Sequence, residues 1–337
     1  MENTIMRNID IYTSTGLKFF RHKSQMENYK KGYSRTIVST HISPEGRCNL
    51  KCKYCSVIKR AKHERLELDV IKRYIEDVVD LGCKAVILTG GGEPTLYPQF
   101  DKLIHLLRSH RSGIKEIALI TNGTTIPYIY MYPFSWVRVS VNYDDYWIRS
   151  FMDNSKQFGK NTTVGLSFVY SGENKRFAPD DLVTIADHIN AKYIRVLPDC
   201  LQTDEEIEDS YKEIDQWLGR EYDNRFFIQH KKKEAPVSNI CHQSYFRPYL
   251  SEIFGGIVFP CDSIPLNDNS GYFDMKYALC VAKDIKQYMS RSIDQPFNAN
   301  RDCQGCVFTH NVNMLEGFMH NDNPIWIKEK IEYENFI

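Results

Sequence analysis

Residues 47–55 read RCNLKCKYC, and the three cysteines in this stretch decide most of the interpretation. Cys48, Cys52 and Cys55 follow a C-x3-C-x2-C spacing, and no fourth cysteine lies nearby. Thiolates are the usual ligands of iron–sulfur clusters, and four of them normally saturate a [4Fe–4S] cluster. Three ligands would leave one iron open to a small molecule, whereas a structural zinc site is normally closed by four ligands. The spacing therefore favours an open cluster over a zinc site completed from a distance or three unrelated thiols.

The overall composition is that of an ordinary globular chain. Its 337 residues are 42% hydrophobic and 26% charged, which is enough for one large domain or two. Lys plus Arg and Asp plus Glu both number 43, which indicates no general nucleic-acid-binding or anionic-membrane surface. No apolar run approaches the ~18 residues of a membrane span, and residues 1–10 lack the apolar core of a signal peptide. The ten cysteines therefore predict metal or redox chemistry in a cytoplasmic protein rather than disulfides.

From about residue 36 onward, strand-like and helix-like patterns alternate. Six such units predict an α/β fold with a parallel sheet and right-handed crossovers, either a doubly wound sheet or an incomplete barrel. The expected strands are rich in β-branched residues, and the expected helices carry apolar residues at helical spacing. The strands span 36–43, 84–89, 116–121, 136–142, 163–170 and 193–197; the helices span 68–81, 100–110, 144–152, 180–190 and 205–218.

The segments at both ends of the chain do not show this alternation of strand and helix patterns. Residues 1–35 are predicted to form an N-terminal extension with little regular structure. A composition shift near residue 220 separates a core domain, 36–220, from a C-terminal domain, 221–337. In the C-terminal domain, residues 226–228 and the pair 250–254 and 257–259 are predicted to be antiparallel strands, followed by a helix near 282–289.

A second motif, TGGGEP at residues 89–94, ends the second predicted strand. Glycines let a ligand approach the backbone closely, and exposed amides can bind a carboxylate or an amine partner. Together the two motifs resemble the cluster-binding and GGE motifs of the radical S-adenosylmethionine (radical SAM) enzymes. Tyr54, directly before the last cysteine, also fits that family. The resemblance covers roughly residues 36–310 and implies that Gly91, Gly92 and Glu93 hold the amino group of SAM.

Polar residues at the ends of later strands are weaker candidates for SAM contacts. Asn122 ends the third strand, and Ser140 and Asn142 end the fourth on the face opposite its valines. If those valines pack against helices, Ser140 and Asn142 face the cavity and can bond the SAM ribose; Ser140 and Asn122 are the favoured ligands. The alternative is that the asparagines only form turns.

Four further side chains are candidates for the substrate pocket or for catalysis. On the sixth strand Arg195 alternates with Ile194 and Val196, which aims it inward. It would clamp the SAM carboxylate, assist substrate proton transfer or form a structural ion pair. His41 on the first strand and Tyr170 on the fifth are two more candidates, each with a structural hydrogen-bonding role as the alternative, and Asp199 after the sixth strand is a fourth.

The C-terminal domain contains a second set of cysteines. Cys241, Cys261, Cys303 and Cys306 supply four thiolates, enough to close one further [4Fe–4S] cluster, although four thiolates also suit zinc. The arrangement resembles the twitch domain, the shorter form of the SPASM auxiliary-cluster domain found after many radical SAM cores. The substitutes considered for one of these ligands are Cys280, His242 and His310. Cys83 and Cys200 are interpreted as ordinary buried cysteines, Cys200 near the pocket.

The resemblance implies a partial (β/α)6 TIM-like barrel with a small C-terminal auxiliary-cluster domain made of a β-hairpin and a helix. SAM and substrate would bind at the carboxyl ends of the strands. A flavodoxin- or ferredoxin-type donor would supply an electron that cleaves SAM to methionine and a 5′-deoxyadenosyl radical, which removes a substrate hydrogen. Three functions stay open: oxidation or rearrangement of a small molecule such as a sugar or aminocyclitol, maturation of a ribosomally made peptide, and a non-enzymatic zinc-binding interaction module.

Overall fold

The strands of the computed structural model form one sheet in the order β10-β9-β8-β1-β2-β3-β4-β5-β6-β7. Neighbours from β8 through β1 to β7 are parallel, and only the β8–β9 and β9–β10 pairs are antiparallel. The structure describes residues 7–32, 35–58, 62–109, 112–125, 134–154, 161–220, 222–230, 233–235, 240–264, 275–290, 297–303 and 305–337. The strands are β1 Ser39–Ile42, β2 Ala85–Leu88, β3 Glu116–Thr121, β4 Trp136–Val141, β5 Thr163–Tyr170, β6 Tyr193–Pro198, β7 Phe226–Ile228, β8 Tyr249–Ser251, β9 Ile257–Phe259 and β10 Cys280–Val281.

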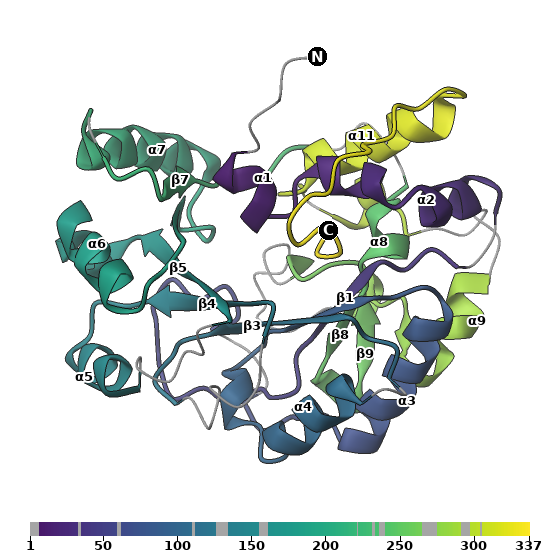
Figure 1. The fold of residues 1–337 in the computed structure, drawn as a ribbon, viewed down its shortest axis with the longest axis horizontal. Coiled ribbons are helices and arrows are strands. Elements are labelled where there is room, and N and C mark those ends of the chain that lie inside the picture. Colours follow the sequence, from purple (N-terminus) through teal and green to yellow (C-terminus); the bar gives the residue numbers. More distant parts are fainter. Residues whose placement is uncertain are drawn as a thin grey trace.

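Five crossover helices cover the outer face of the curved sheet (Figure 1). They are α3 Leu68–Asp80, α4 Phe100–Arg108, α5 Asp145–Asn154, α6 Pro179–His188 and α7 Asp204–Leu218, close to the predicted ranges. In α3 the buried side chains Ile71, Tyr74, Ile75 and Val78 recur at helical spacing and form the stripe that packs on the sheet. The order of the described strands has two ends, β10 and β7, so the sheet is not closed. The predicted partial barrel is therefore confirmed.

Because side chains alternate along each strand, the curved sheet has an interior and an exterior face. In β4, Val137 and Val139 are completely buried and belong to the main core cluster. Trp136 and Arg138 alternate with them and line an interior cavity. In β4 the face that carries Arg138 thus points to the interior, as predicted for an incomplete barrel with its site inside.

The prediction of little regular structure before residue 35 is wrong. Three short helical segments occur there: α1 Asn8–Tyr12, the 3-10 helix η1 Gly16–Arg21 and α2 Lys23–Lys30. Helices this short are marginal by themselves, so tertiary contacts must hold them. Arg21 Nε donates to the carboxylate of Glu334 at 2.7 Å, and Lys18 Nζ donates to the carbonyl of Phe336 at 3.3 Å. Figure 1 shows this segment beside the C-terminal part of the chain, which includes α11 Thr309–His320.

The C-terminal strands are partly as predicted. The prediction that residues 226–228 are antiparallel is wrong, because β7 pairs with β6 in parallel. The β8–β9 hairpin is antiparallel as expected, and its turn places Gly255 and Gly256 at φ 75° and 122°, a region that favours glycine. β8 also pairs with β1 in parallel, so the hairpin extends the barrel sheet. The domain boundary near residue 220 stays a prediction.

The other described helical segments are short. The helix expected near residues 282–289 is present as η9 Ala282–Asp284 followed by α9 Ile285–Ser290. The rest are η2 Pro94–Leu96, η5 Gly172–Arg176, α8 Gln243–Phe246, η6 Ile253–Gly255, η8 Met275–Tyr277 and α10 Ala299–Asp302. Within the described ranges, no helix has the length and apolar character needed to cross a membrane.

Candidate functional site

The cysteine loop follows β1, and amide donors point at its sulfurs. Asn142 Nδ2 lies 3.0 Å from Cys52 Sγ, and Asn122 Nδ2 lies 3.8 Å from Cys48 Sγ. Burial raises the pKa of Cys52, and the neighbouring Cys55 and Cys48 raise it further. Amide N–H groups aimed at sulfur stabilise the thiolate form that binds a cluster. These contacts support the three-thiolate site predicted for the loop, and the site itself stays a prediction.

Tyr54 fixes this loop to the end of β4. Its hydroxyl donates to the side-chain oxygen of Asn142 at 2.9 Å and approaches the carbonyl of Val141 at 3.3 Å. Asn142 is thus held by Tyr54 while its amide nitrogen approaches Cys52. Sequence analysis placed Asn142 on the cavity face without recognising its sulfur contact, because the pairing joins residues 90 positions apart.

The glycine turn after β2 packs directly against the start of the cysteine loop. Gly92 N donates to the carbonyl of Glu45 at 2.9 Å, and Glu93 N donates to the carbonyl of Arg47 at 2.7 Å. A Cβ atom at Gly92 would overlap the backbone of Gly46 and Arg47. Only glycine permits this approach, which brings the two motifs together at one edge of the sheet.

Glu93 is buried and already holds several protein groups. Its carboxylate accepts hydrogen bonds from Thr95 Oγ1 at 2.7 Å, Thr121 Oγ1 at 2.6 Å and Asn122 N at 2.7 Å. Burial raises the pKa of Glu93, and the bonds from Thr121 and Asn122 act in the opposite direction. Glu93 therefore ties the glycine turn to the end of β3. Its direct contact with the SAM amine stays a prediction.

The side chain of Asn122 is also engaged within this region. Its Nδ2 donates to Asn49 Oδ1 at 2.9 Å, and its Oδ1 accepts from Thr124 Oγ1 at 2.6 Å. These bonds orient the amide toward Cys48. The predicted contact of Asn122 with the SAM ribose would have to coexist with this network, and it stays a prediction.

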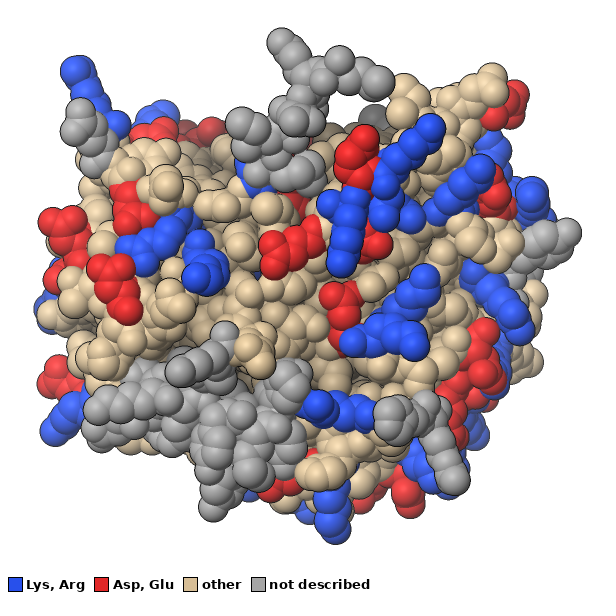
Figure 2. Space-filling view, in the orientation of Figure 1, with Lys and Arg blue, Asp and Glu red and all other residues tan. Residues whose placement is uncertain are grey.

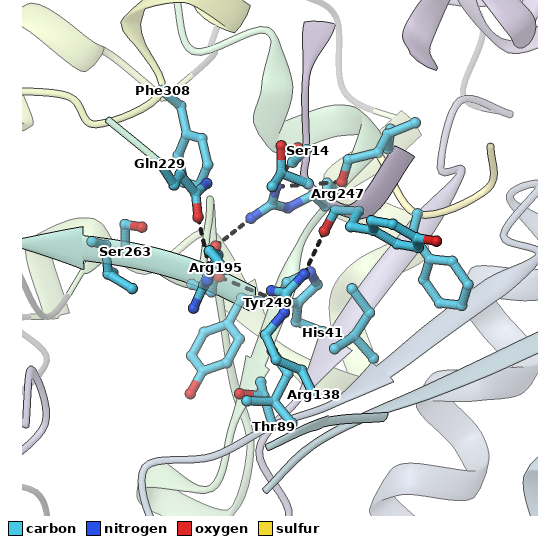
Figure 3. Close-up of a pocket in the computed structure, with 18 of the residues that line it drawn as sticks. Ser14, His41, Thr89, Arg138, Arg195, Gln229, Arg247, Tyr249, Ser263 and Phe308 are labelled. Atoms are coloured by element: carbon cyan, nitrogen blue, oxygen red, sulfur yellow. Dashed lines mark hydrogen bonds and ion pairs between the residues drawn. The ribbon is translucent and has the colours of Figure 1, made fainter. Parts of the chain in front are cut away.

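An interior cavity of about 280 Å³ reaches both motifs. Ser56 and Val57, which follow Cys55, line it together with Thr89 and Gly90, which precede the rest of the glycine turn. The predicted pocket residues His41 and Arg195 line it too, as does Cys200. Figure 3 shows His41, Thr89 and Arg195 around this space.

Residues near the end of the chain close the cavity at the amino ends of the strands. The ring of Phe336 packs edge-on against Trp136, the first residue of β4, with centroids 5.3 Å apart. The hydroxyl of Tyr333 bonds Thr163, the first residue of β5, and both Phe336 and Ile337 line the cavity. The cavity is thus covered at this end and extends toward the cysteine loop at the other.

Two of the predicted polar candidates lie elsewhere. The ring of Tyr170 packs against Trp217, with centroids 5.5 Å apart, on the helix-covered side of β5. Asp199 accepts hydrogen bonds from Ser171 Oγ and Leu201 N, both at 2.9 Å. Neither is among the described residues that line the cavity, and Ser140 is not among them either. A direct substrate contact from Tyr170 would require the side chain to leave its packed position.

The four C-terminal cysteines lie near one another. Cys241, Cys261 and Cys303 belong to one hydrophobic cluster, to which Val57 of the cysteine loop also contributes. Burial raises the pKa of Cys241 to about 12, with Cys306 and Cys303 as the next causes. Among the described residues, no three His, Cys, Asp or Glu side chains are arranged to hold a single metal ion.

The possible substitutes for one of these cysteines are placed differently. Cys280 packs with the barrel core rather than with the other C-terminal cysteines. His242 Nδ1 pairs with the hydroxyl of Tyr29 at 2.7 Å, and its Nε2 pairs with Glu316 at 2.8 Å. Both ring nitrogens of His242 therefore have partners, and His310 is exposed.

Sequence analysis missed several charged residues that line the cavity. Lys18, Arg138, Arg247 and Asp262 are among them. The alternation that pointed Ser140 inward also pointed Arg138 inward, so Arg138 could have been found. Lys18 and Arg247 lie outside the regular strands, where no sequence period predicts the direction in which a side chain points.

Comparison with known proteins finds one matching family model. Residues 42–157 match the model of the radical SAM superfamily. A GTP 3′,8-cyclase of Peptoclostridium acidaminophilum is 38% identical over 96 residues, which span 27% of this chain and 29% of that protein. The matched part thus covers less than a third of the curated relative.

Two solved structures share the fold at low sequence identity. The structure of anSMEcpe with bound AdoMet and Kp18Cys peptide is 18% identical, with a TM-score of 0.52 over 82% of this chain and 88% of that one. Streptococcus suis SuiB bound to precursor peptide SuiA is 14% identical, with a TM-score of 0.51 over 88% of this chain and 69% of that one.

Proposed function

We propose that this protein is an enzyme that reductively cleaves SAM and removes a hydrogen atom from a small molecule bound in the interior cavity; the match of residues 42–157 to the radical SAM superfamily model supports the proposal. The observation that carries the proposal is that one cavity reaches both motifs. Residues 56–57 and 89–90 flank the cysteines and the glycine turn, and all four line the same space as His41 and Arg195.

The residues present fit the cofactors that the family implies. Cys48, Cys52 and Cys55 would hold the cluster, and the backbone of Gly91 and Gly92 would hold the amino group of SAM. When bound, the cluster and SAM supply one-electron cleavage of a C–S bond and hydrogen abstraction from substrate. Asn142 and Tyr54 orient the loop that holds the cluster.

The protein's own contribution is a small cavity that is covered at one end. A cavity of about 280 Å³ matches a small molecule better than a peptide, which would need an open groove. The packing of Phe336 on Trp136 closes one end and keeps water from entering there. A peptide substrate would have to displace this segment or enter from the side of the cysteine loop.

We further propose that Cys241, Cys261, Cys303 and Cys306 hold an auxiliary cluster that transfers electrons. A cluster closed by four thiolates has no free iron to bind substrate. Val57 packs against this cysteine cluster and also lines the cavity, so the two regions are adjacent. A flavodoxin- or ferredoxin-type protein is the proposed electron donor.

The test is SAM cleavage by anaerobically reconstituted protein. With dithionite and SAM, slow formation of 5′-deoxyadenosine is expected even without substrate, measured by liquid chromatography. A variant with Cys48, Cys52 and Cys55 all changed to Ala is the negative control. Protein with a full complement of iron and sulfide that forms no 5′-deoxyadenosine would contradict the proposal.

A further inference from the structure

The interior cavity is strongly cationic. Among the side chains of the described residues that line it, those of Lys18, Arg138, Arg195 and Arg247 are basic and only that of Asp262 is acidic; the main-chain oxygen of Ile337 adds one further acceptor. Lys18, Arg138 and Arg247 are 1%, 7% and 2% exposed. On the outer face seen in Figure 2, by contrast, Lys and Arg are interspersed with Asp and Glu. The excess of positive charge is therefore a property of the cavity.

Three of these cations come from different elements and face the same space (Figure 3). Arg138 is on β4, Arg195 is on β6, and Arg247 directly follows α8. Most of their partners are neutral. Arg138 Nε donates to the hydroxyl of Tyr193 at 3.0 Å, and Arg195 donates to Gln229 Oε1 at 2.7 Å. Arg247 bonds Ser14, the main-chain oxygen of Ile337 at 3.3 Å and the carboxylate of Asp262, its one acidic side-chain partner.

Several donors in this cavity have no partner. The Nε atoms of Arg195 and Arg247 and both ring nitrogens of His41 are buried without a hydrogen bond. His41 Nδ1 is 3.5 Å from the carboxylate of Asp262 and makes no hydrogen bond with it, and burial lowers the pKa of His41 to about 3, so the ring is neutral near pH 7. Buried unpaired donors are rare in folded proteins and usually have a functional reason.

The cations also destabilise one another. Burial, followed by the charge of Arg138, lowers the pKa of Lys18 to about 7 and the pKa of Arg195 to about 9. The neutral partners above do not offset this repulsion. A bound anion would, because it supplies the charge and the acceptors that the cavity lacks.

We propose that the substrate carries a compact anionic group, a carboxylate or a phosphate, which binds between Arg138, Arg195 and Arg247. This inference rests on the proposed function, since it names the class of molecule that the same cavity receives. Guanidinium groups suit both anions because their N–H donors match paired oxygens. His41 supplies a further donor to the bound group.

The position of the arginines also orients the substrate. Arg138 and Arg195 each stand three residues before the end of their strand. At ~3.3 Å per residue, the backbone of both arginines lies about 10 Å below the carboxyl ends of their strands, the same end of the sheet from which the cysteine loop and the glycine turn emerge. Ile87, Ile120 and Leu197 line the cavity as well. The substrate therefore has an uncharged part that reaches toward the loop, and the hydrogen is removed from that part.

The experiment is anion binding to the reconstituted holoenzyme. Inorganic phosphate and acetate are titrated by calorimetry at constant ionic strength, with chloride as the reference anion. One of the two should bind with saturation, and which one binds distinguishes phosphate from carboxylate. Arg195→Gln should weaken that binding about 30-fold or more, because one partner of a buried charge pair is lost. Arg176→Gln, at an exposed ion pair with Glu173, is the matched control and should bind as the wild type does.

Two results would overturn the inference. The first is that neither phosphate nor acetate binds with saturation. The second is that SAM displaces the bound anion, because this result would assign the site to the carboxylate of the cofactor. Should Arg195→Gln fail to fold, Arg138→Gln takes its place, and the wild-type titrations stand independently. Formation of 5′-deoxyadenosine is measured in the same wild-type sample, so a protein that cleaves SAM without binding either anion refutes only this inference.

Discussion

The side-chain amide of Asn142 lies 3.0 Å from the sulfur of Cys52, although 90 residues separate the two in sequence. A hydrogen bond to a cluster ligand stabilises the reduced, more negative cluster and so raises its reduction potential. Asn142→Leu should lower the midpoint potential of the SAM-binding cluster by about 50 mV, the equivalent of a hydrogen bond of about 1 kcal/mol. A redox titration followed by electron paramagnetic resonance measures it. The exposed Asn323→Leu should leave the potential unchanged, and an unchanged potential in Asn142→Leu would show that the contact does not influence the cluster.

The two cysteine sets should be separable by iron content. Changing Cys48, Cys52 and Cys55 to Ala should leave one cluster, about four irons, in reconstituted protein. Cys83→Ala is the control, because the thiol of Cys83 is buried against the carbonyl of Ala85, away from both sets. Iron and acid-labile sulfide are assayed chemically. Zinc without sulfide in the wild type would refute both clusters and favour a zinc-binding module.

The auxiliary cysteines should influence product formation more than SAM cleavage. Cys303→Ala should remove the second cluster while 5′-deoxyadenosine still forms, and the ratio of oxidised product to 5′-deoxyadenosine should fall. Cys280→Ala is matched in residue type but alters the barrel core, so both clusters should persist. Circular dichroism checks that each variant folds. A folded Cys303→Ala protein with an unchanged ratio would argue for a structural role and a redox-neutral reaction.

Replacement of Glu93 should weaken SAM binding and also destabilise the fold. Glu93→Ala leaves the hydroxyl of Thr121 and the backbone N–H of Asn122 without their acceptor. Roughly 2–4 kcal/mol of unfolding free energy should be lost, measured by denaturant titration. SAM affinity, measured by calorimetry on protein that retains its iron, should fall as well. The exposed Glu67→Ala should change neither quantity, and unaltered SAM affinity in Glu93→Ala would reduce Glu93 to a structural residue.

Stability should decrease in mild acid because of His22. Its Nε2 donates to the carbonyl of Glu334 at 2.8 Å, and burial lowers its pKa to about 4. The unfolded chain binds a proton at this histidine below pH ~6.5, whereas the folded protein does not, so stability is complete above that pH and is lost as pH falls toward 4. Glutamine at this position retains a donor but does not titrate. Between pH 7 and 4, the unfolding free energy of His22→Gln should therefore fall by roughly 2–3 kcal/mol less than that of the wild type. The exposed His105→Gln should follow the wild type, and parallel curves for His22→Gln would refute the assignment.

The regular part of the fold was predictable because its signals are local. The six strands and five helices from residue 36 to 218 follow apolar periods that survive in the structure. The N-terminal helices gave no such signal, since contacts such as Arg21 with Glu334 hold them. The three residues of β7 are too few to reveal the direction of pairing, which is why the antiparallel prediction failed.

The site, too, was predictable only where its signals are local in the sequence. Motif spacing identified the cysteine loop and the glycine turn, and alternation identified Arg195. The contact of Asn142 with Cys52 and the place of Arg247 beside Asp262 depend on how distant segments meet. No sequence period encodes such contacts, so the part of the cavity's charge that comes from Lys18, Arg247 and Asp262 became visible only in the folded chain.

The pairing of β1 with β8 has a consequence for biogenesis. His41 is in register with Tyr249, so one edge of an early strand has no partner until more than two hundred further residues have been synthesised. An unpaired strand edge is a template for pairing with other chains. The nascent barrel is therefore most prone to aggregate while the ribosome is translating its second half, and a chaperone that shields β1 during that interval would raise the yield of folded enzyme.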